Sequence, residues 1–199
     1  MAVFPYQDYQ VNFANKISTF RILSVPFFIA SLVYYAPQRD YLRFVALGIF
    51  TLAVISDAVD GYIARTAKQQ SKAGLVLDPL GDKLLLVSAF ICLSLIDNFP
   101  LGIRFPLWVT LIVVSRDALI LLGAVVVYIV KQNIDISPTR WGKFTTTFQM
   151  ISVIVVLLQW RSAYFFWWIA VFFTLISGSD YVKRGFKTLY ALDNSRNHH

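Results

Sequence analysis

Four aspartates lie between residues 57 and 82, flanked by two apolar runs that are each long enough to cross a membrane. They are Asp57, Asp60, Asp78 and Asp82. An ionised carboxylate inside a membrane segment costs roughly 2.5–3.5 kcal/mol on insertion scales. Four such groups require something that offsets their charge, and divalent metal ions are the simplest candidates.

The composition excludes a soluble domain. Of 199 residues, 57% are hydrophobic and only 15% are charged, and the mean hydropathy is +0.62. A soluble domain carries about 25% charged residues. Cys92 is alone in an apolar run, so we expect no disulfide framework and no cysteine zinc site. We expect no removable signal peptide, and we assign no function to His198 and His199, which resemble the remnant of a purification tag.

Apolar runs of about 20 residues, the length that spans the hydrocarbon core, predict six membrane helices. Their ranges are near 15–36, 40–66, 75–97, 105–131, 140–160 and 162–187. The break before residue 162 is weak, so a five-helix bundle with one long bent helix is the alternative. The predicted fold class is an all-α integral membrane bundle of six transmembrane helices. It forms a single domain over residues 1–199, with a short interfacial segment at 1–14 and a polar tail at 188–199.

The cationic side chains predict how this bundle is oriented. With both termini in the cytoplasm, most lysines and arginines lie on the cytoplasmic side, and only Arg39, Arg43, Arg104 and Arg161 lie on the other side. Cytoplasmic loops of membrane proteins carry an excess of lysine and arginine. We therefore expect both termini and the carboxylate cluster to face the cytoplasm.

The first two aspartates share a helix face with two small residues and an arginine. At the helical period, Asp57, Asp60, Gly61, Ala64 and Arg65 occupy one arc of about 140°. The small residues leave room for a ligand to approach the backbone. The arginine offers a planar cation that can hold a phosphate oxygen in two-pronged fashion.

The other two aspartates, Asp78 and Asp82, lie one turn apart on the next predicted helix. The short connection makes the two helices antiparallel neighbours, so their acidic faces can meet. The combined oxygens suffice for two Mg²⁺ or Mn²⁺ ions, or for Ca²⁺. Metal ions, an arginine and a bare helix surface together indicate a pyrophosphate site. The alternative is that the acids pair with Lys68, Lys72 and Lys83 and only pack the bundle.

These residues form the pattern D-x2-D-G-x2-A-R-x8-G-x3-D-x3-D. Its fixed positions are Asp57, Asp60, Gly61, Ala64, Arg65, Gly74, Asp78 and Asp82. The pattern resembles the signature of the CDP-alcohol phosphotransferases, six-helix membrane enzymes of phospholipid synthesis. The resemblance implies transfer of a substituted phosphate from a CDP-linked donor to an alcohol, with release of CMP.

The resemblance also implies roles for single residues. The four aspartates would hold two divalent metal ions, Mg²⁺ or Mn²⁺, and Asp82 would be the base that deprotonates the acceptor hydroxyl. The CDP site would be lined by Gly61, Ala64, Arg65 and Gly74, with Ser71 as a weaker candidate. A metal-bound carboxylate is normally a poor base. Asp82 can therefore act as the base only if it keeps one oxygen free or lies at longer range.

Three cations further along the chain suggest where the acceptor binds. Arg116 lies deep in the fourth predicted helix, while Arg140 and Lys143 lie near the start of the fifth. A membrane arginine normally faces a partner or a cavity. If these bases point inward, they form a second anion site, and the acceptor itself carries a phosphate. An aspartate partner for Arg116, and a lysine that only reaches the membrane surface, are the alternatives.

Two short runs resemble different members of the family. Gly142-Lys143-x-Thr-Thr146-x2-Gln149-Met150 resembles phosphatidylglycerophosphate synthases, whereas Ser115-Arg116-Asp117-x-Leu-x-Leu-x-Gly123-Ala124 resembles the cardiolipin synthases that use a CDP-lipid. The expected reaction transfers a phosphatidyl group from CDP-diacylglycerol to glycerol 3-phosphate and gives phosphatidylglycerophosphate. Phosphatidylglycerol as the acceptor, in cardiolipin synthesis, and inositol phosphate stay open.

The expected partners are the two substrates, the lipid bilayer and, by family resemblance, a second copy in a homodimer. We expect no nucleic acid partner, and we expect the cytoplasmic membrane of a prokaryote. A cation transporter that uses intramembrane carboxylates is the alternative of another class, and a purely structural scaffold is a third. A transporter of repeated halves predicts matching acids in the second half of the chain, which the sequence lacks.

Overall fold

The computed structural model describes residues 13–67, 74–131 and 140–196, which form six α-helices and one 3-10 turn. The elements are α1 (Phe13–Val33), η1 (Pro37–Arg39), α2 (Tyr41–Ala67), α3 (Gly74–Leu95), α4 (Leu107–Lys131), α5 (Arg140–Leu157) and α6 (Ala163–Arg196). The prediction of an all-helical protein with six helices is confirmed. Helix α6 continues to Arg196, through most of the segment expected to be a polar tail.

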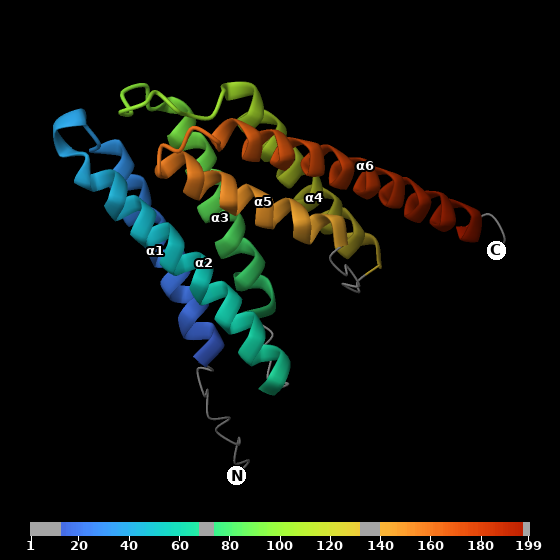
Figure 1. Cartoon of the computed structure of the whole chain (residues 1–199). Helices are drawn as coiled ribbons and strands as arrows, with labels where there is room; N and C mark the ends of the chain where they lie inside the picture. Colours follow the sequence, from blue (N-terminus) through green and yellow to red (C-terminus); the bar gives the residue numbers. More distant parts are fainter. Residues whose placement is uncertain (1–12, 68–73, 132–139, 197–199) are drawn as a thin grey trace, which may run out of the picture.

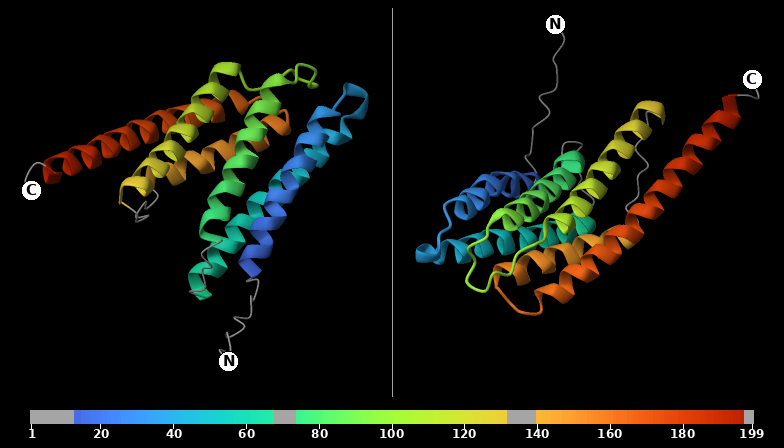
Figure 2. Two further views of the ribbon diagram at one scale, coloured as in Figure 1. Left: turned by 180° about the vertical axis from the view of Figure 1, so that it is seen from behind. Right: turned by 90° about the horizontal axis from the view of Figure 1, so that it is seen from above.

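The helices form two groups that α3 and α5 connect (Figures 1 and 2). Helix α1 packs along both α2 and α3, while α6 packs along both α4 and α5. Helix α5 also contacts α2 and α3, and α3 contacts α4. Helices α2 and α3 run in opposite directions, as their short connection predicts. The C-terminal part of α2 and the N-terminal part of α3, which carry the acidic motif, lie at the same end of the bundle.

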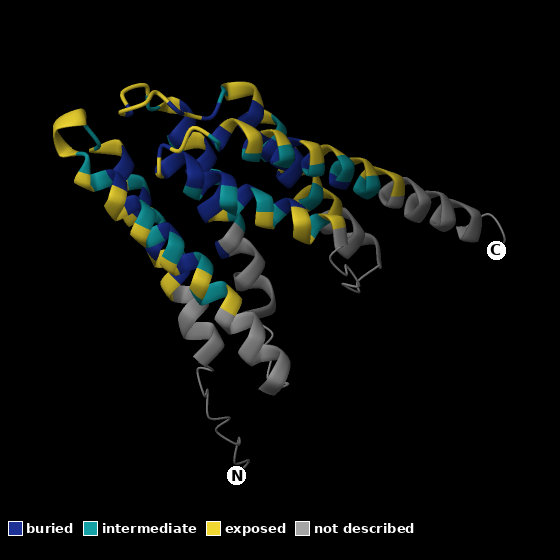
Figure 3. Cartoon of the chain, viewed as in Figure 1, coloured by how far each residue is buried: buried dark blue, intermediate teal, exposed yellow. Residues whose placement is uncertain are grey.

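Many large apolar residues are exposed on the outside of the described helices, and Figure 3 shows exposed positions recurring along these helices. Phe27, Leu111, Phe165 and Phe172 are each more than 60% exposed. A soluble monomer rarely exposes contiguous apolar surface on this scale. Within the described residues, two helical segments are long and apolar enough to cross a membrane, Tyr41–Ala58 in α2 and Ala163–Lys183 in α6.

Two sets of buried aromatic rings pack between helices, one within the α1–α2 pair and one between α3 and α6. Phe28 of α1 lies 5.8 Å from Phe50 of α2, measured between ring centroids. Phe90 of α3 stacks at 4.4 Å on Phe105, which in turn lies 6.3 Å from Trp167 of α6. Such ring pairs contribute about 0.5–1.5 kcal/mol each beyond the burial of their area. The Phe28–Phe50 pair therefore stabilises the contact of α1 with α2, and the Phe90–Phe105–Trp167 stack stabilises the contact of α3 with α6.

The break between α5 and α6 excludes the five-helix alternative. Helix α5 ends at Leu157, and Gln159 adopts a φ of 55° that continues neither helix. The side-chain amide of Gln159 donates to the carbonyl oxygens of Ile103 and Val156, both at 2.8 Å. Its oxygen accepts the backbone N–H groups of Leu101 and Ile103. These buried hydrogen bonds offset the cost of the left-handed backbone, about 1–3 kcal/mol.

An ion pair ties the α1–α2 connection to the end of α5. Arg43 donates from Nε and Nη2 to the two carboxylate oxygens of Asp40, at 2.8 and 2.7 Å. Its Nη1 donates to the carbonyl oxygen of Leu157 at 2.5 Å. The hydrogen bonds from Arg43 hold the pKa of the Asp40 carboxyl below its ordinary value. The last turn of α5 is thereby anchored at the end of the bundle opposite the acidic motif.

Candidate active site

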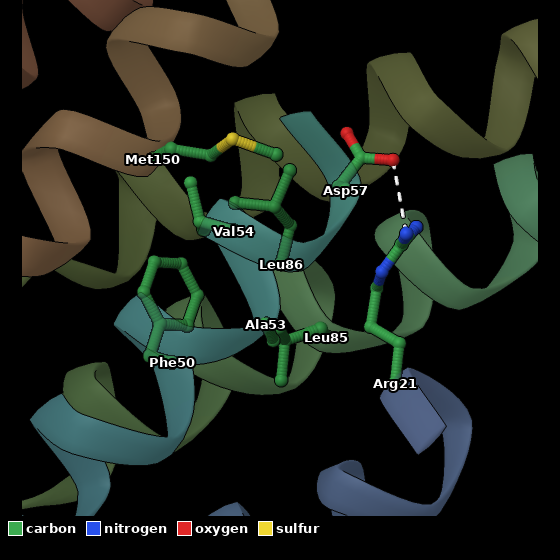
Figure 4. Close-up of a pocket in the computed structure, with 8 residues that line it drawn as sticks. All are labelled: Arg21, Phe50, Ala53, Val54, Asp57, Leu85, Leu86 and Met150. Carbon is green, nitrogen blue, oxygen red and sulfur yellow. Dashed lines mark ion pairs between the residues drawn. The ribbon is translucent and has the colours of Figure 1, made fainter. Parts of the chain in front are cut away.

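Asp57 lies where four helices meet. The cavity beside it is lined by Arg21 of α1, Phe50, Ala53, Val54 and Asp57 of α2, Leu85 and Leu86 of α3, and Met150 of α5 (Figure 4). Six of these eight side chains are apolar, and four of the six, Phe50, Ala53, Leu85 and Leu86, are buried. A carboxylate in this position requires a charged partner or a bound cation, because apolar surroundings penalise an isolated charge.

Arg21 supplies a charged partner for Asp57. Its Nη2 lies 3.0 Å from Oδ1 of Asp57, and its side chain is 2% exposed whereas that of Asp57 is 38% exposed. Figure 4 shows one carboxylate oxygen of Asp57 directed toward Arg21 and the other directed away from it. Asp57 therefore has one oxygen engaged by the protein and one available for a further ligand.

A glycine on α3 allows α1 to approach this closely. A Cβ atom built on Gly81 would lie 3.3 Å from Cγ1 of Ile22 and 4.0 Å from Cδ of Arg21. The first distance is tighter than ordinary van der Waals contact, so an alanine at this position would require the Ile22 side chain to move by a few tenths of an ångström. The stem of Arg21 thus passes Gly81 of α3, the residue that precedes Asp82 in the chain. The guanidinium of Arg21 reaches Asp57 of α2.

The backbone places the other three aspartates on the same two helices. Asp60 follows Asp57 by one turn of α2, and Asp78 and Asp82 lie in the N-terminal part of α3. Of the four aspartates, only Asp57 belongs to the side chains that the structure describes. Among those side chains, no group of three or more His, Cys or Asp residues forms a complete metal site.

The residues predicted to bind the CDP-linked donor lie on the same two helices as the aspartates, apart from Ser71. Gly61, Ala64 and Arg65 lie in the C-terminal part of α2, and Gly74 is the first residue of α3. Ser71 lies outside the described residues. The exposed oxygen of Asp57 is a hard donor of the kind that Mg²⁺ and Mn²⁺ prefer, so the part of the motif that is described fits such an ion.

A second charged cluster lies between α3, α4 and α6. Nη1 of Arg116 donates to Oδ1 of Asp117 at 2.6 Å, and Nζ of Lys83 binds the same oxygen. Nη2 of Arg116 donates to Oγ of Ser177, and the guanidinium carbon lies 6.0 Å from the ring centroid of Tyr181. Arg116 therefore has the aspartate partner that the sequence left as an alternative, and that partner is its neighbour in the chain.

This cluster also retains hydrogen-bonding capacity. Nε of Arg116 and Oδ2 of Asp117 are buried and have no hydrogen-bond partner among the described residues. A buried polar atom without a partner costs about 1–3 kcal/mol, so its presence requires an explanation such as a ligand. Among the described residues, the cluster combines two cationic side chains with one anionic side chain, which suits the binding of an anion.

The remaining predicted acceptor residues lie at the start of α5. Lys143 is exposed in the first turn, and Arg140 is the first residue of that helix. The side chain of Arg140 is outside the described set. Lys143 can therefore move freely at the surface, whereas Arg116 is fixed in the interior.

Sequence reasoning assigned no site role to Arg21 or Lys83. The sequence indicates only that both cations lie on the cytoplasmic side of the bundle and that Lys83 could pair with the acidic motif. Arg21 stands at the edge of the apolar stretch Phe20–Val33, and an arginine in that position signals a buried partner. Only the packing of α1 against α2 in the structure identifies that partner as Asp57.

Comparison with known proteins assigns this fold and motif to a class of enzyme. The family model for CDP-alcohol phosphatidyltransferases matches residues 11–176, and the chain belongs to that family. It is therefore a transferase, as the aspartate signature indicated.

Bacterial relatives show which members of the family this chain is similar to. The chain is 30% identical to a probable phosphatidylglycerophosphate synthase of Mycobacterium tuberculosis, over 89% of this chain and 83% of that protein. It is also 30% identical to a CDP-diacylglycerol–glycerol-3-phosphate 3-phosphatidyltransferase of Bacillus subtilis, over 89% of this chain and 97% of the relative. A protein with the same name from Aquifex aeolicus is 26% identical, over 90% and 99% of the two chains.

Proposed function

We propose that this protein synthesises phosphatidylglycerophosphate by transferring the phosphatidyl group of CDP-diacylglycerol to glycerol 3-phosphate, with release of CMP. The observation that carries the proposal is similarity over nearly the full chain to relatives named for this reaction. The complete aspartate signature supports it, because a chain that had lost the chemistry would have no need to keep four membrane carboxylates.

The proposed setting is the cytoplasmic membrane of a bacterium, with all six helices crossing the bilayer and both termini in the cytoplasm. The connections at 34–40, 96–106 and 158–162 lie at one end of the bundle, opposite the acidic motif (Figure 1). The sequence around the other helix ends, including Lys131 at the end of α4 and Arg140 at the start of α5, is rich in lysine and arginine, which favours the cytoplasm as the compartment of the site. The water-soluble acceptor would then enter from the cytoplasm.

In the proposed site, Asp57, Asp60, Asp78 and Asp82 hold two divalent metal ions, Mg²⁺ or Mn²⁺. When bound, the ions would neutralise the diphosphate and stabilise the departing CMP. Arg65 binds a phosphate oxygen of the donor. Gly61, Ala64 and Gly74, with Ser71, leave the space in which the cytidine diphosphate lies.

The acceptor binds beside this site in the same proposal. Arg116, Arg140 and Lys143 hold the phosphate of glycerol 3-phosphate, and Asp82 accepts the proton of the attacking hydroxyl. The buried Nε of Arg116, which has no hydrogen-bond partner among the described residues, supports this role, because it offers a donor to an anion. The attacking oxygen then displaces CMP from the phosphorus atom.

Substrate-specific kinetics test the division of roles. Arg116→Ala and Lys143→Ala should each raise the KM for glycerol 3-phosphate roughly ten- to hundred-fold, because each removes a charge-assisted contact. The KM for CDP-diacylglycerol should stay nearly constant. Arg65→Ala should raise the donor KM instead. Arg161→Ala, at an exposed arginine in the opposite connection, is the matched control.

The acceptor identity is tested with the same purified protein. CDP-diacylglycerol is offered with glycerol 3-phosphate, phosphatidylglycerol, inositol phosphate and uncharged alcohols, and the products are identified by mass spectrometry. A better yield with an uncharged alcohol, or acceptor KM values within twofold of wild type in both variants, would contradict the phosphate-acceptor site. Cardiolipin as the main product would assign phosphatidylglycerol as the acceptor.

A further inference from the structure

We infer that Arg21 of α1 is a positioning residue that orients Asp57 for metal binding, so that the metal site depends on three helices and not only on the two that carry the signature. The inference rests on the proposed metal-dependent function and adds a residue outside the signature. Arg21 is assigned no contact with substrate. Its action runs through the carboxylate of Asp57.

The first support is that only one of the two carboxylate oxygens of Asp57 is directed toward Arg21. Oδ1 forms an ion pair with Nη2 of Arg21 at 3.0 Å, while the Asp57 side chain as a whole is 38% exposed. An ion pair at one oxygen restricts rotation about the last side-chain bond. The other oxygen is then presented in one direction (Figure 4).

The second support is the burial of the arginine. Its side chain is 2% exposed, so the guanidinium cannot swing into solvent or toward a substrate without a movement of α1. An arginine kept in an apolar membrane segment is costly, and such residues are generally functional or paired. A fixed, planar, always-charged group is well suited to holding a carboxylate.

The third support is the packing that fixes Arg21 in place. Its stem passes Gly81 of α3, where a Cβ atom would lie 3.3 Å from Ile22 and 4.0 Å from Arg21. The close contact of α1 with α3 therefore sets where the guanidinium meets α2. In metal sites generally, the outer-shell partners of the ligating side chains set ligand orientation, and losing one typically costs about 10–100-fold in metal affinity or activity.

The test measures Mn²⁺ binding directly, by calorimetry or by electron paramagnetic resonance of the free ion, on the purified full chain in lipid nanodiscs. Arg21→Gln should raise the Kd for Mn²⁺ about 10–100-fold. Arg21→Lys keeps the charge without the planar fork and should give an intermediate Kd. Arg161→Gln, which removes an exposed arginine, should stay within twofold of wild type.

Gly81→Ala provides a variant that keeps every charge. The added Cβ presses on the Ile22 side chain beside the stem of Arg21, which must move by a few tenths of an ångström, so we expect a smaller but measurable rise in the Mn²⁺ Kd. If Arg21→Gln does not fold, judged by its melting temperature, Arg21→Lys and Gly81→Ala decide the question.

Two results would overturn the inference. Unchanged Mn²⁺ affinity in the folded Arg21 variants would make the ion pair purely structural, and tighter binding would make Arg21 a competitor of the metal. A wild-type protein that binds no Mn²⁺ would instead overturn the proposed metal site itself, and Asp57→Asn serves as the reference for loss of a ligand.

Discussion

Replacing Asp117 by asparagine should destabilise the protein more than a substitution on α4 that leaves the charge of the helix unchanged. Asp117 is the shared anion of Lys83 and Arg116, and the side chains of Asp117, Arg116 and Lys83 are 2%, 7% and 22% exposed. Asparagine keeps the shape of the side chain and removes its charge. Arg116 is then a buried cation without the carboxylate that compensates it.

The expected cost is about 3 kcal/mol of unfolding free energy. Removing one partner of a buried ion pair typically costs about 3–5 kcal/mol. The lower end applies because Lys83 is partly exposed and can turn toward water, whereas Arg116 cannot. Arg116→Met leaves the Lys83–Asp117 pair intact and should cost only about 1–2 kcal/mol, since the hydroxyl of Ser177 can turn to a carbonyl one turn earlier.

A double-mutant cycle measured by equilibrium unfolding in mixed detergent micelles, followed by circular dichroism, isolates the electrostatic part. The variant with both Asp117→Asn and Arg116→Met should be destabilised by about 2 kcal/mol, well below the sum of the single effects, because the buried uncompensated cation is gone. Additivity within about 0.5 kcal/mol, or a cost of Asp117→Asn below about 1 kcal/mol, would refute the reasoning.

Further variants test other parts of the account. Asp82→Asn should nearly abolish turnover while CDP-diacylglycerol and Mn²⁺ still bind; equal loss of donor binding and turnover would make Asp82 chiefly a metal ligand. Gln159→Ala should lower the melting temperature, because buried backbone groups at Leu101 and Ile103 lose their partners, at a cost of about 2–3 kcal/mol. Trp160→Ala, at an exposed neighbour, should change it little, and equal melting temperatures would contradict the role of Gln159.

The helices could be predicted from the sequence because each depends on a long local apolar pattern. The sequence also predicts that each pair of carboxylates in the acidic motif shares one face of its own helix, because of the spacing within the pair. The end of α6 was placed too early, near residue 187, because loss of hydropathy marks the edge of a membrane and not the end of a helix. No proline interrupts the run to Arg196, so the helix continues.

Contacts between distant segments could not be predicted in the same way. The break between α5 and α6 depends on hydrogen bonds between the Gln159 side chain and the backbone of Leu101 and Ile103. These residues are far apart in the sequence, so no local pattern predicts the contact. The partners of Arg21 and Lys83 likewise lie on other helices. The homodimer expected from the family resemblance stays a prediction, as do all four metal ligands, Asp57 included, and the orientation in the membrane.

Metal-dependent CMP release is the most direct test of the central claim. Purified protein in nanodiscs is supplied with CDP-diacylglycerol and glycerol 3-phosphate, and CMP and phosphatidylglycerophosphate are quantified with EDTA and after addition of excess Mg²⁺ or Mn²⁺. The account predicts no product with EDTA, recovery with either ion, and a much weaker recovery in Asp57→Asn. Full release of CMP in metal-free buffer would contradict it.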